Sequence, residues 1–127
     1  MEYLAHIDGE RKQSVKSHLC GTAEMAGGFA ERFGKADWGY CCGMLHDIGK
    51  YSLAFQEKIK NNSNKQVDHS TAGAKECFEK GGMYGFMSYC IAGHHSGLPD
   101  YGSSSDAGNA PTLEGRKRKR LEDYSAF

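Results

Sequence analysis

The sequence predicts an all-α fold in which about five or six helices form a bundle with short connections. Apolar residues recur at steps of three and four between Val15 and Phe33, as on one face of an amphipathic helix. No segment of useful length alternates apolar and polar residues as a half-buried strand would. A chain of 127 residues is long enough for a single domain, residues 1–127, whose core needs neither a disulfide nor a structural metal.

The first three helices are predicted from apolar spacing and from residues that favour helix ends. The apolar stripe of the first helix consists of Val15, Leu19, Ala23, Ala26, Ala30 and Phe33. The second helix is expected to follow Asp37 as its N-cap and to run to His46 and Asp47, with Gly49 ending it. Ser52 is the expected N-cap of a short third helix.

The remaining helices are expected in the second half of the chain. Asp68 or Ser70 opens the fourth helix, and the fifth begins near Tyr84. Residues 97–111 are rich in Gly, Ser, Asp and Asn and contain both prolines, which predicts a long flexible loop. Thr112 is expected to cap a final short helix that carries a basic run.

Composition excludes several classes of protein. The chain has 16 Lys and Arg against 16 Asp and Glu, so its formal net charge is zero with neutral histidines. No apolar run approaches the roughly 18 residues that span a bilayer, and the N-terminus lacks the features of a signal peptide. We therefore expect a cytoplasmic protein without membrane partners. The five cysteines include no C-x-x-C pair and are expected to be reduced thiols.

The histidines carry the strongest chemical signal. Five of the six fall at predicted helix ends or beside an apolar stripe, namely His18, His46, His69, His94 and His95, and Asp47 adjoins one of them. Imidazole and carboxylate together suit Fe, Mn, Co, Ni and Zn, and several helices of a bundle can direct such groups to one point. Any single histidine could equally be a surface residue or a hydrogen-bonded core residue. The residues alone leave that choice open.

Four motifs in order carry a resemblance to a known family. They are His18 on the first helix, Leu45-His46-Asp47-Ile48-Gly49-Lys50, Asp68-His69-Ser70 with Gly73, and Gly93-His94-His95-Ser96-Gly97. These residues resemble the HD superfamily of metal-dependent phosphohydrolases. With Ala5-His6-Ile7 and Leu98-Pro99, they are more narrowly similar to the HD nuclease domain of the type I CRISPR-associated helicase-nuclease.

The resemblance implies an HD-superfamily helical bundle with a metal centre. It implies a first metal held by His18, His46 and Asp47, and a second held by His69, His94 and His95, with Asp47 bridging. One or two divalent transition ions are expected, with Mn, Fe, Ni or Co favoured over Mg or Zn. Two cations can neutralise phosphodiester oxygens and activate water. Asp47 and Lys50 would be catalytic, the lysine by stabilising developing negative charge.

The chain departs from the family pattern after the double-histidine motif. Members usually carry a further acidic ligand on a later helix, and their domains are longer. The downstream candidates Asp100, Asp106 and Asp123 lie in no similar segment. We therefore expect a fragment that lacks the C-terminal helices of the bundle, in which one metal binds firmly and the first site is incomplete.

The leading functional hypothesis is a metal-dependent endonuclease that hydrolyses single-stranded DNA in type I CRISPR interference. The implied partners are single-stranded DNA, a CRISPR-associated helicase on the same or a separate chain, and an RNA-guided surveillance complex. The basic run Arg116, Lys117, Arg118, Lys119 and Arg120 either contacts phosphates or forms a solvated helix face. Two alternatives stay open: a phosphohydrolase of nucleotides or cyclic dinucleotides, and a metal-binding interaction module with weak or no turnover.

Overall fold

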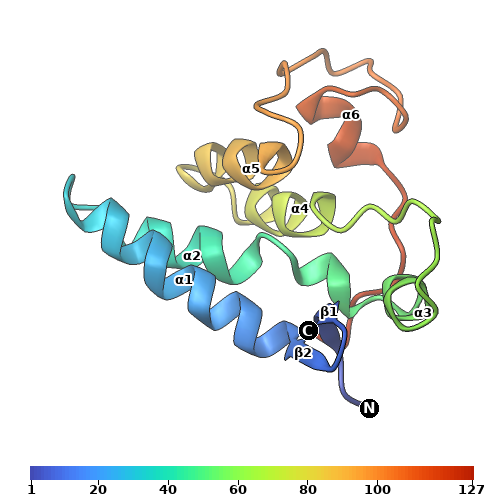
Figure 1. Ribbon diagram of the computed structural model, residues 1–127. Coiled ribbons are helices and arrows are strands. Elements are labelled where there is room, and N and C mark those ends of the chain that lie inside the picture. The colour runs from blue at the N-terminus through green and yellow to red at the C-terminus, as the bar shows by residue number, and fades with distance from the viewer.

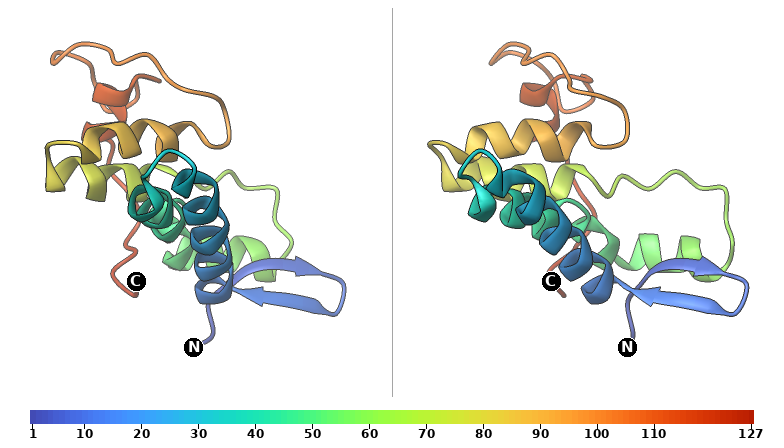
Figure 2. Two further views of the ribbon diagram at one scale, coloured as in Figure 1. Left: turned by 90° about the vertical axis from the view of Figure 1, so that its left-hand side faces the viewer. Right: turned by 60° about the vertical axis from the view of Figure 1, so that its left-hand side comes forward.

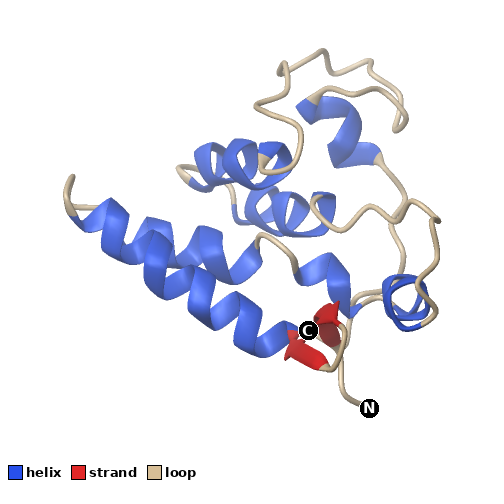
Figure 3. Ribbon diagram, in the orientation of Figure 1, coloured by secondary structure: helices blue, strands red, loops and turns tan.

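The computed structural model describes residues 1–127 and is mostly helical, as predicted. In chain order the elements are β1 (Leu4–Asp8), β2 (Arg11–Ser14), α1 (Val15–Glu31), α2 (Ala36–Leu45), the short 3-10 helix η1 (Ile48–Tyr51), α3 (Leu53–Lys60), α4 (Thr71–Lys80), α5 (Tyr84–Gly93) and α6 (Leu113–Arg118). Strands β1 and β2 form one antiparallel hairpin, and everything else is helix or loop (Figure 3). No helix is both long and apolar enough to span a membrane.

The helices pack as pairs around one core. Helices α1 and α2 run side by side, α4 and α5 form a second pair, and α6 lies against α4 (Figures 1 and 2). The largest apolar side chains of the core are Val15, Leu19, Leu45, Ile48, Met87, Ile91 and Leu113. The last residues run from α6 back to η1, where Phe127 packs on Tyr51 with ring centroids 6.0 Å apart. The five cysteines form no disulfide.

Local capping chemistry places several helix starts where the sequence predicts them. The Ser52 hydroxyl accepts a hydrogen bond from the Phe55 amide at 3.3 Å, and the Thr112 hydroxyl accepts one from the Gly115 amide at 3.1 Å. Each bond satisfies an amide that has no partner within the first turn of its helix. Both predicted N-caps are therefore confirmed.

Three predictions about α1 and α2 are wrong. Lys35 occupies the N-cap of α2, and Asp37 lies within the first turn, where its charge faces the positive end of the helix dipole. The helix ends at Leu45 instead of continuing to Gly49, because the backbone turns at Asp47 into η1. Phe33 lies beyond the end of α1 and is 71% exposed, since no element packs there.

The hairpin is the element that the sequence analysis does not predict. Its strands are short, and the register shifts between Leu4 and His6, so alternation is lost. The buried Gln56 side chain accepts a hydrogen bond from the Leu4 amide at 2.9 Å and donates to the carbonyls of Leu4 at 2.9 Å and Lys50 at 2.8 Å. Strand β1 is thus fixed to α3 and η1 by one side chain that is distant in sequence.

The start of α4 shows which of its two candidate residues acts as a cap. Ser70 occupies the N-cap position, but its hydroxyl makes no capping bond. The Asp68 carboxylate accepts from the amides of Ser70 at 3.1 Å and Thr71 at 3.0 Å, and from the Thr71 hydroxyl at 2.6 Å. Asp68 therefore satisfies the free amides of α4 and holds the segment that contains His69.

Gly73 allows α4 to approach the end of α2. A Cβ atom at this position would overlap the Leu45 carbonyl oxygen and would lie 3.1 Å from the Ile91 side chain. Because this contact is with backbone atoms and not with the end of a flexible side chain, a side chain at position 73 would force the two helices apart. This contact sets the separation between the α1–α2 pair and the α4–α5 pair.

We predict that Gly73→Ala lowers the free energy of unfolding by about 1–3 kcal/mol, as expected when a packed core is overfilled. Gly28→Ala is the matched control, since nothing lies within 4 Å of a Cβ built there. That change should stabilise α1 by about 0.5–1 kcal/mol. Urea unfolding followed by circular dichroism measures both, and equal stability of the two variants would contradict the close approach.

Candidate metal centre

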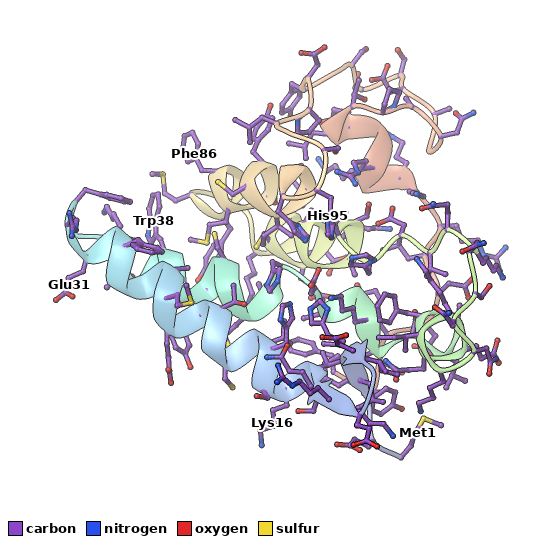
Figure 4. All side chains as sticks on the ribbon, in the orientation of Figure 1. Met1, Lys16, Glu31, Trp38, Phe86 and His95 are labelled. Carbon is purple, nitrogen blue, oxygen red and sulfur yellow. The ribbon has the colours of Figure 1, made fainter.

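Side chains from four separate segments converge on Asp47. His18 projects from α1, His46 and Asp47 follow the end of α2, and His69 precedes α4. His94 and His95 follow α5, and Figure 4 labels His95 at the C-terminal end of that helix. Because each histidine lies at a helix end or on the inner face of α1, the packing of the helices brings the imidazoles together.

The two carboxylate oxygens of Asp47 face different histidines. Its Oδ2 atom lies 2.9 Å from His18 Nε2 and 3.2 Å from His46 Nε2. Its Oδ1 atom lies 3.0 Å from His94 Nε2 and 3.7 Å from His69 Nε2. The side chain is only 3% exposed. A single buried carboxylate thus connects both halves of the centre.

The donor atoms form two clusters that share Asp47. We call His18, His46 and Asp47 the first cluster, and Asp47, His69 and His95 the second cluster. Within each cluster the ligand atoms all lie within 4.8 Å of one another. Paired imidazole nitrogens face each other at 3.1 Å in the first cluster and at 2.8 Å in the second. His94 lies between the clusters, with its ring centroid 5.1 Å from that of His46 and 4.2 Å from that of His95.

Backbone carbonyls orient three of the imidazoles for metal binding. The Nδ1 atom of His46 lies 2.7 Å from the Gly43 carbonyl, and that of His94 lies 2.7 Å from the Ile91 carbonyl. His69 Nδ1 lies 3.1 Å from the Val67 carbonyl. A carbonyl only accepts, so Nδ1 carries a proton, and Nε2 faces the centre: it offers a lone pair to a metal in the neutral ring and donates to Asp47 only when the ring is protonated. The donor set therefore fits divalent transition ions.

Asp47 stays ionised in this environment. Burial by itself would raise the pKa of its carboxyl, but hydrogen bonds from three imidazoles and the positive charge of Lys50 outweigh burial and hold the pKa far below its usual range. Lys50 Nζ lies 2.9 Å from Asp47 Oδ2 and is itself buried. Lys50 is therefore a buried partner of Asp47 and not a solvated surface lysine.

Burial lowers the pKa values of the histidines, whereas the Asp47 carboxylate raises them. Burial lowers the pKa of His69 and of His95, which favours their neutral, metal-binding forms. For His94, burial also acts to lower the pKa, but its hydrogen bonds to Asp47 and to the Ile91 carbonyl raise it above 6.5. The pKa of His94 is therefore shifted in the opposite direction from the pKa values of His69 and His95.

Gly49 explains why the two clusters can share one carboxylate. A Cβ atom on Gly49 would lie 2.7 Å from both the Cα and the carbonyl oxygen of His69. Such contacts are too short for any residue other than glycine. The His46-Asp47 turn can therefore lie directly against the backbone that carries the second cluster.

One residue beside the centre was not assigned a role from the sequence. His6, on β1, places its Nε2 atom 3.5 Å from Lys50 Nζ, and its ring centroid lies 4.8 Å from that of His18. The motif that contains His6 was visible in the sequence, but only the hairpin brings it to the centre. Neither cluster contains a carboxylate other than Asp47, so Asp100, Asp106 and Asp123 lie outside both.

Two residues of the basic run at 116–120 form ion pairs within the chain. Glu114 lies 3.7 Å from Lys117 and 3.2 Å from Arg118. The helix ends at Arg118, so the last two residues of the run lie outside it. Phosphate binding by this run stays a prediction.

Comparison with known families decides the assignment of the chain. The model of the HD domain family matches residues 15–126, which include every histidine of the two clusters. The chain belongs to the HD family. HD domains are metal-dependent phosphohydrolases, so this membership and the His/Asp clusters agree on the class of chemistry. No curated protein sequence matches this HD domain.

We predict that Asp47→Asn removes all tight binding of divalent metal, because both clusters lose their shared carboxylate. His18→Gln should retain an ion in the second cluster, which does not contain His18. Asp37→Asn, on the exposed first turn of α2, is the control for loss of one carboxylate and should bind as the native chain does. Elemental analysis after metal loading and desalting gives the ions per chain. Full occupancy in Asp47→Asn would refute the shared-ligand arrangement.

We also predict that metal affinity falls as the pH is lowered, starting above pH 6.5. A ligand imidazole must be neutral, and the raised pKa of His94 keeps that ring protonated to a higher pH than an ordinary histidine. Asp47, whose pKa is lowered, contributes no such competition. Calorimetric titration with Mn²⁺ in buffers of different ionisation enthalpy should detect proton release near neutral pH, and its absence would count against His94 as a ligand.

Proposed function

We propose that this HD domain is a metal-dependent endonuclease that cleaves single-stranded DNA, acting with a CRISPR-associated helicase and an RNA-guided complex in type I interference. The observation that carries the proposal is Asp47, whose two oxygens each face a separate group of histidines. Such an arrangement suits two cations acting on one phosphodiester. The four motifs that resemble the CRISPR nuclease supply the choice of DNA.

The exposure of the centre supports a polymeric substrate. His95 is exposed, the His94 side chain is 23% exposed, and an open, mostly apolar groove of about 360 Å³ between α1, α2 and α5 reaches His46 and His94. A phosphodiester within a long strand can approach such a surface from the side. An enzyme that acts on free nucleotides usually buries most of its ligand in a pocket.

Each residue has a distinct role in this proposal. The histidines and Asp47 would hold one or two divalent transition ions, of which Mn, Fe, Ni and Co suit imidazole with a single carboxylate. Bound ions supply charge neutralisation at phosphate oxygens and activation of water. Asp47 fixes the spacing between the clusters. The Lys50 ammonium, whose Nζ lies 2.9 Å from Asp47 Oδ2, keeps that carboxylate ionised and oriented. His6 lies at the edge of the centre, where a substrate could approach it.

A second function fits the same centre. Hydrolysis of a nucleotide or a cyclic dinucleotide requires the same metal ligands, and HD family membership is shared by both activities. Metal binding without turnover is the third possibility, because each cluster offers only three protein ligands. The substrate test below separates all three.

We expect circular single-stranded DNA to be cut by metal-stripped protein after Mn²⁺, Co²⁺, Ni²⁺ or Fe²⁺ is restored, and Mg²⁺ or Zn²⁺ to be less effective. A circular substrate has no ends, so any product requires an endonuclease. Asp47→Asn should lower the rate by about 10²-fold or more, the scale seen when a key charge-stabilising group is lost. Asp37→Asn should cut at the native rate.

Other outcomes select between the alternatives. Hydrolysis of a cyclic dinucleotide with intact circular DNA would replace the proposal with the nucleotide reading. A folded, metal-loaded protein that cleaves neither substrate would support the interaction module.

A further inference from the structure

Arg116 differs from the rest of the basic run because its guanidinium points into the protein. One terminal nitrogen donates to the Ala92 carbonyl, and the other donates to the Ser70 hydroxyl at 3.0 Å. Ser70 and Ala92 are both buried, and Arg116 is half-buried. Arg116, one of the five residues expected either to contact phosphates or to be solvated, therefore donates to two acceptors inside the fold.

The two acceptors lie beside the histidines of the second half of the centre. Ser70 directly follows His69, and Ala92 is two residues before His94. Lys119 adds a contact on the other side of His69, because its ammonium lies 2.6 Å from the Asp68 carboxylate. The last turn of α5 and the segment before α4 are thus both attached to α6 and the residue that follows it.

The contact with Ala92 also completes the C-terminal end of α5. The last carbonyls of a helix have no partner within the helix. Here the Ile91 carbonyl accepts from the His94 amide at 3.4 Å and the Gly93 carbonyl accepts from the Gly97 amide at 2.8 Å, while Arg116 satisfies the carbonyl between them. Without Arg116, a buried carbonyl at the base of the His94-His95 turn would lose its side-chain partner.

We propose that Arg116 is a positioning residue for the second cluster, tying the His69 segment to the His94-His95 turn so that their Nε2 atoms face Asp47. The proposal rests on the metal-dependent function proposed above. Arginine suits this role because its planar group holds several donors at fixed angles and can reach two acceptors at once. Lysine has a single charged nitrogen and cannot hold both acceptors in the same geometry.

The two clusters depend on this contact to different extents. In the first cluster His46 and Asp47 are adjacent in the chain, and α1 packs directly on α2. In the second cluster His69 and His95 come from different segments 26 residues apart, and Arg116 bridges those segments. Loss of Arg116 should therefore affect the second cluster selectively.

Titration with Co²⁺, followed by its visible absorption and without any nucleic acid, tests the proposal. His69→Gln identifies which binding event belongs to the second cluster. Arg116→Gln should weaken that event by about tenfold or more, the lower end of the range for residues that orient metal ligands. It should leave the other event unchanged. Arg116→Lys should give an intermediate affinity, because one of the two contacts can be kept.

Arg32→Gln is the matched control, since it removes the same group from an exposed position at the end of α1. It should bind Co²⁺ as the native chain does. Melting temperatures of the metal-free variants report the fold, and if Arg116→Gln does not fold, Arg116→Lys provides the comparison.

Three results would overturn the proposal: native affinity in a folded Arg116 variant, an equal loss in both binding events together with a lower melting temperature, or no event that depends on His69. Failure of the proposed nuclease function is measured by DNA cleavage, which is independent of Co²⁺ binding. If circular DNA is not cut but Arg116→Gln weakens the His69-dependent event, the nuclease proposal fails and the positioning role stands.

Discussion

Burial of the Asp47 carboxylate is the constraint on which the rest of the structure depends. An ionised group that is almost fully removed from water is costly unless it is paired and hydrogen-bonded. Here the partners are imidazoles from four segments and the Lys50 ammonium. Helices α1, α2, α4 and α5 must therefore meet at one point, which makes the metal centre and the packing of the bundle a single problem.

Residues outside the centre keep that point in place. Gly73 sets the approach of α4 to the end of α2, and Gly49 lets the Asp47 turn lie against His69. Gln56 fixes the hairpin to η1, and Arg116 joins the ends of α4 and α5. None of these four residues is a metal ligand. Each acts by fixing a separation between two backbone segments, which is what a pair of metal clusters requires.

The same packing also decides how the centre meets a substrate. Backbone carbonyls take the Nδ1 protons, so the Nε2 atoms face inward, while the rings of His94 and His95 remain partly open to solvent. The groove beside His46 and His94 extends the open side between α1 and α5. A buried carboxylate and partly exposed imidazoles give an asymmetric centre, whose solvent-accessible side is formed by His94 and His95.

The sequence by itself determined the all-α class, the caps at Ser52 and Thr112, and the set of candidate ligands. Those features depend on residues within a few positions of one another or on motifs that can be read directly. Only the tertiary structure decided that Phe33 is exposed, that Lys50 is buried, that Asp68 caps α4 in place of Ser70, that His6 reaches the centre and that Arg116 points inward. Each of these depends on contacts between distant segments, and local pattern carries no information about which segments will meet.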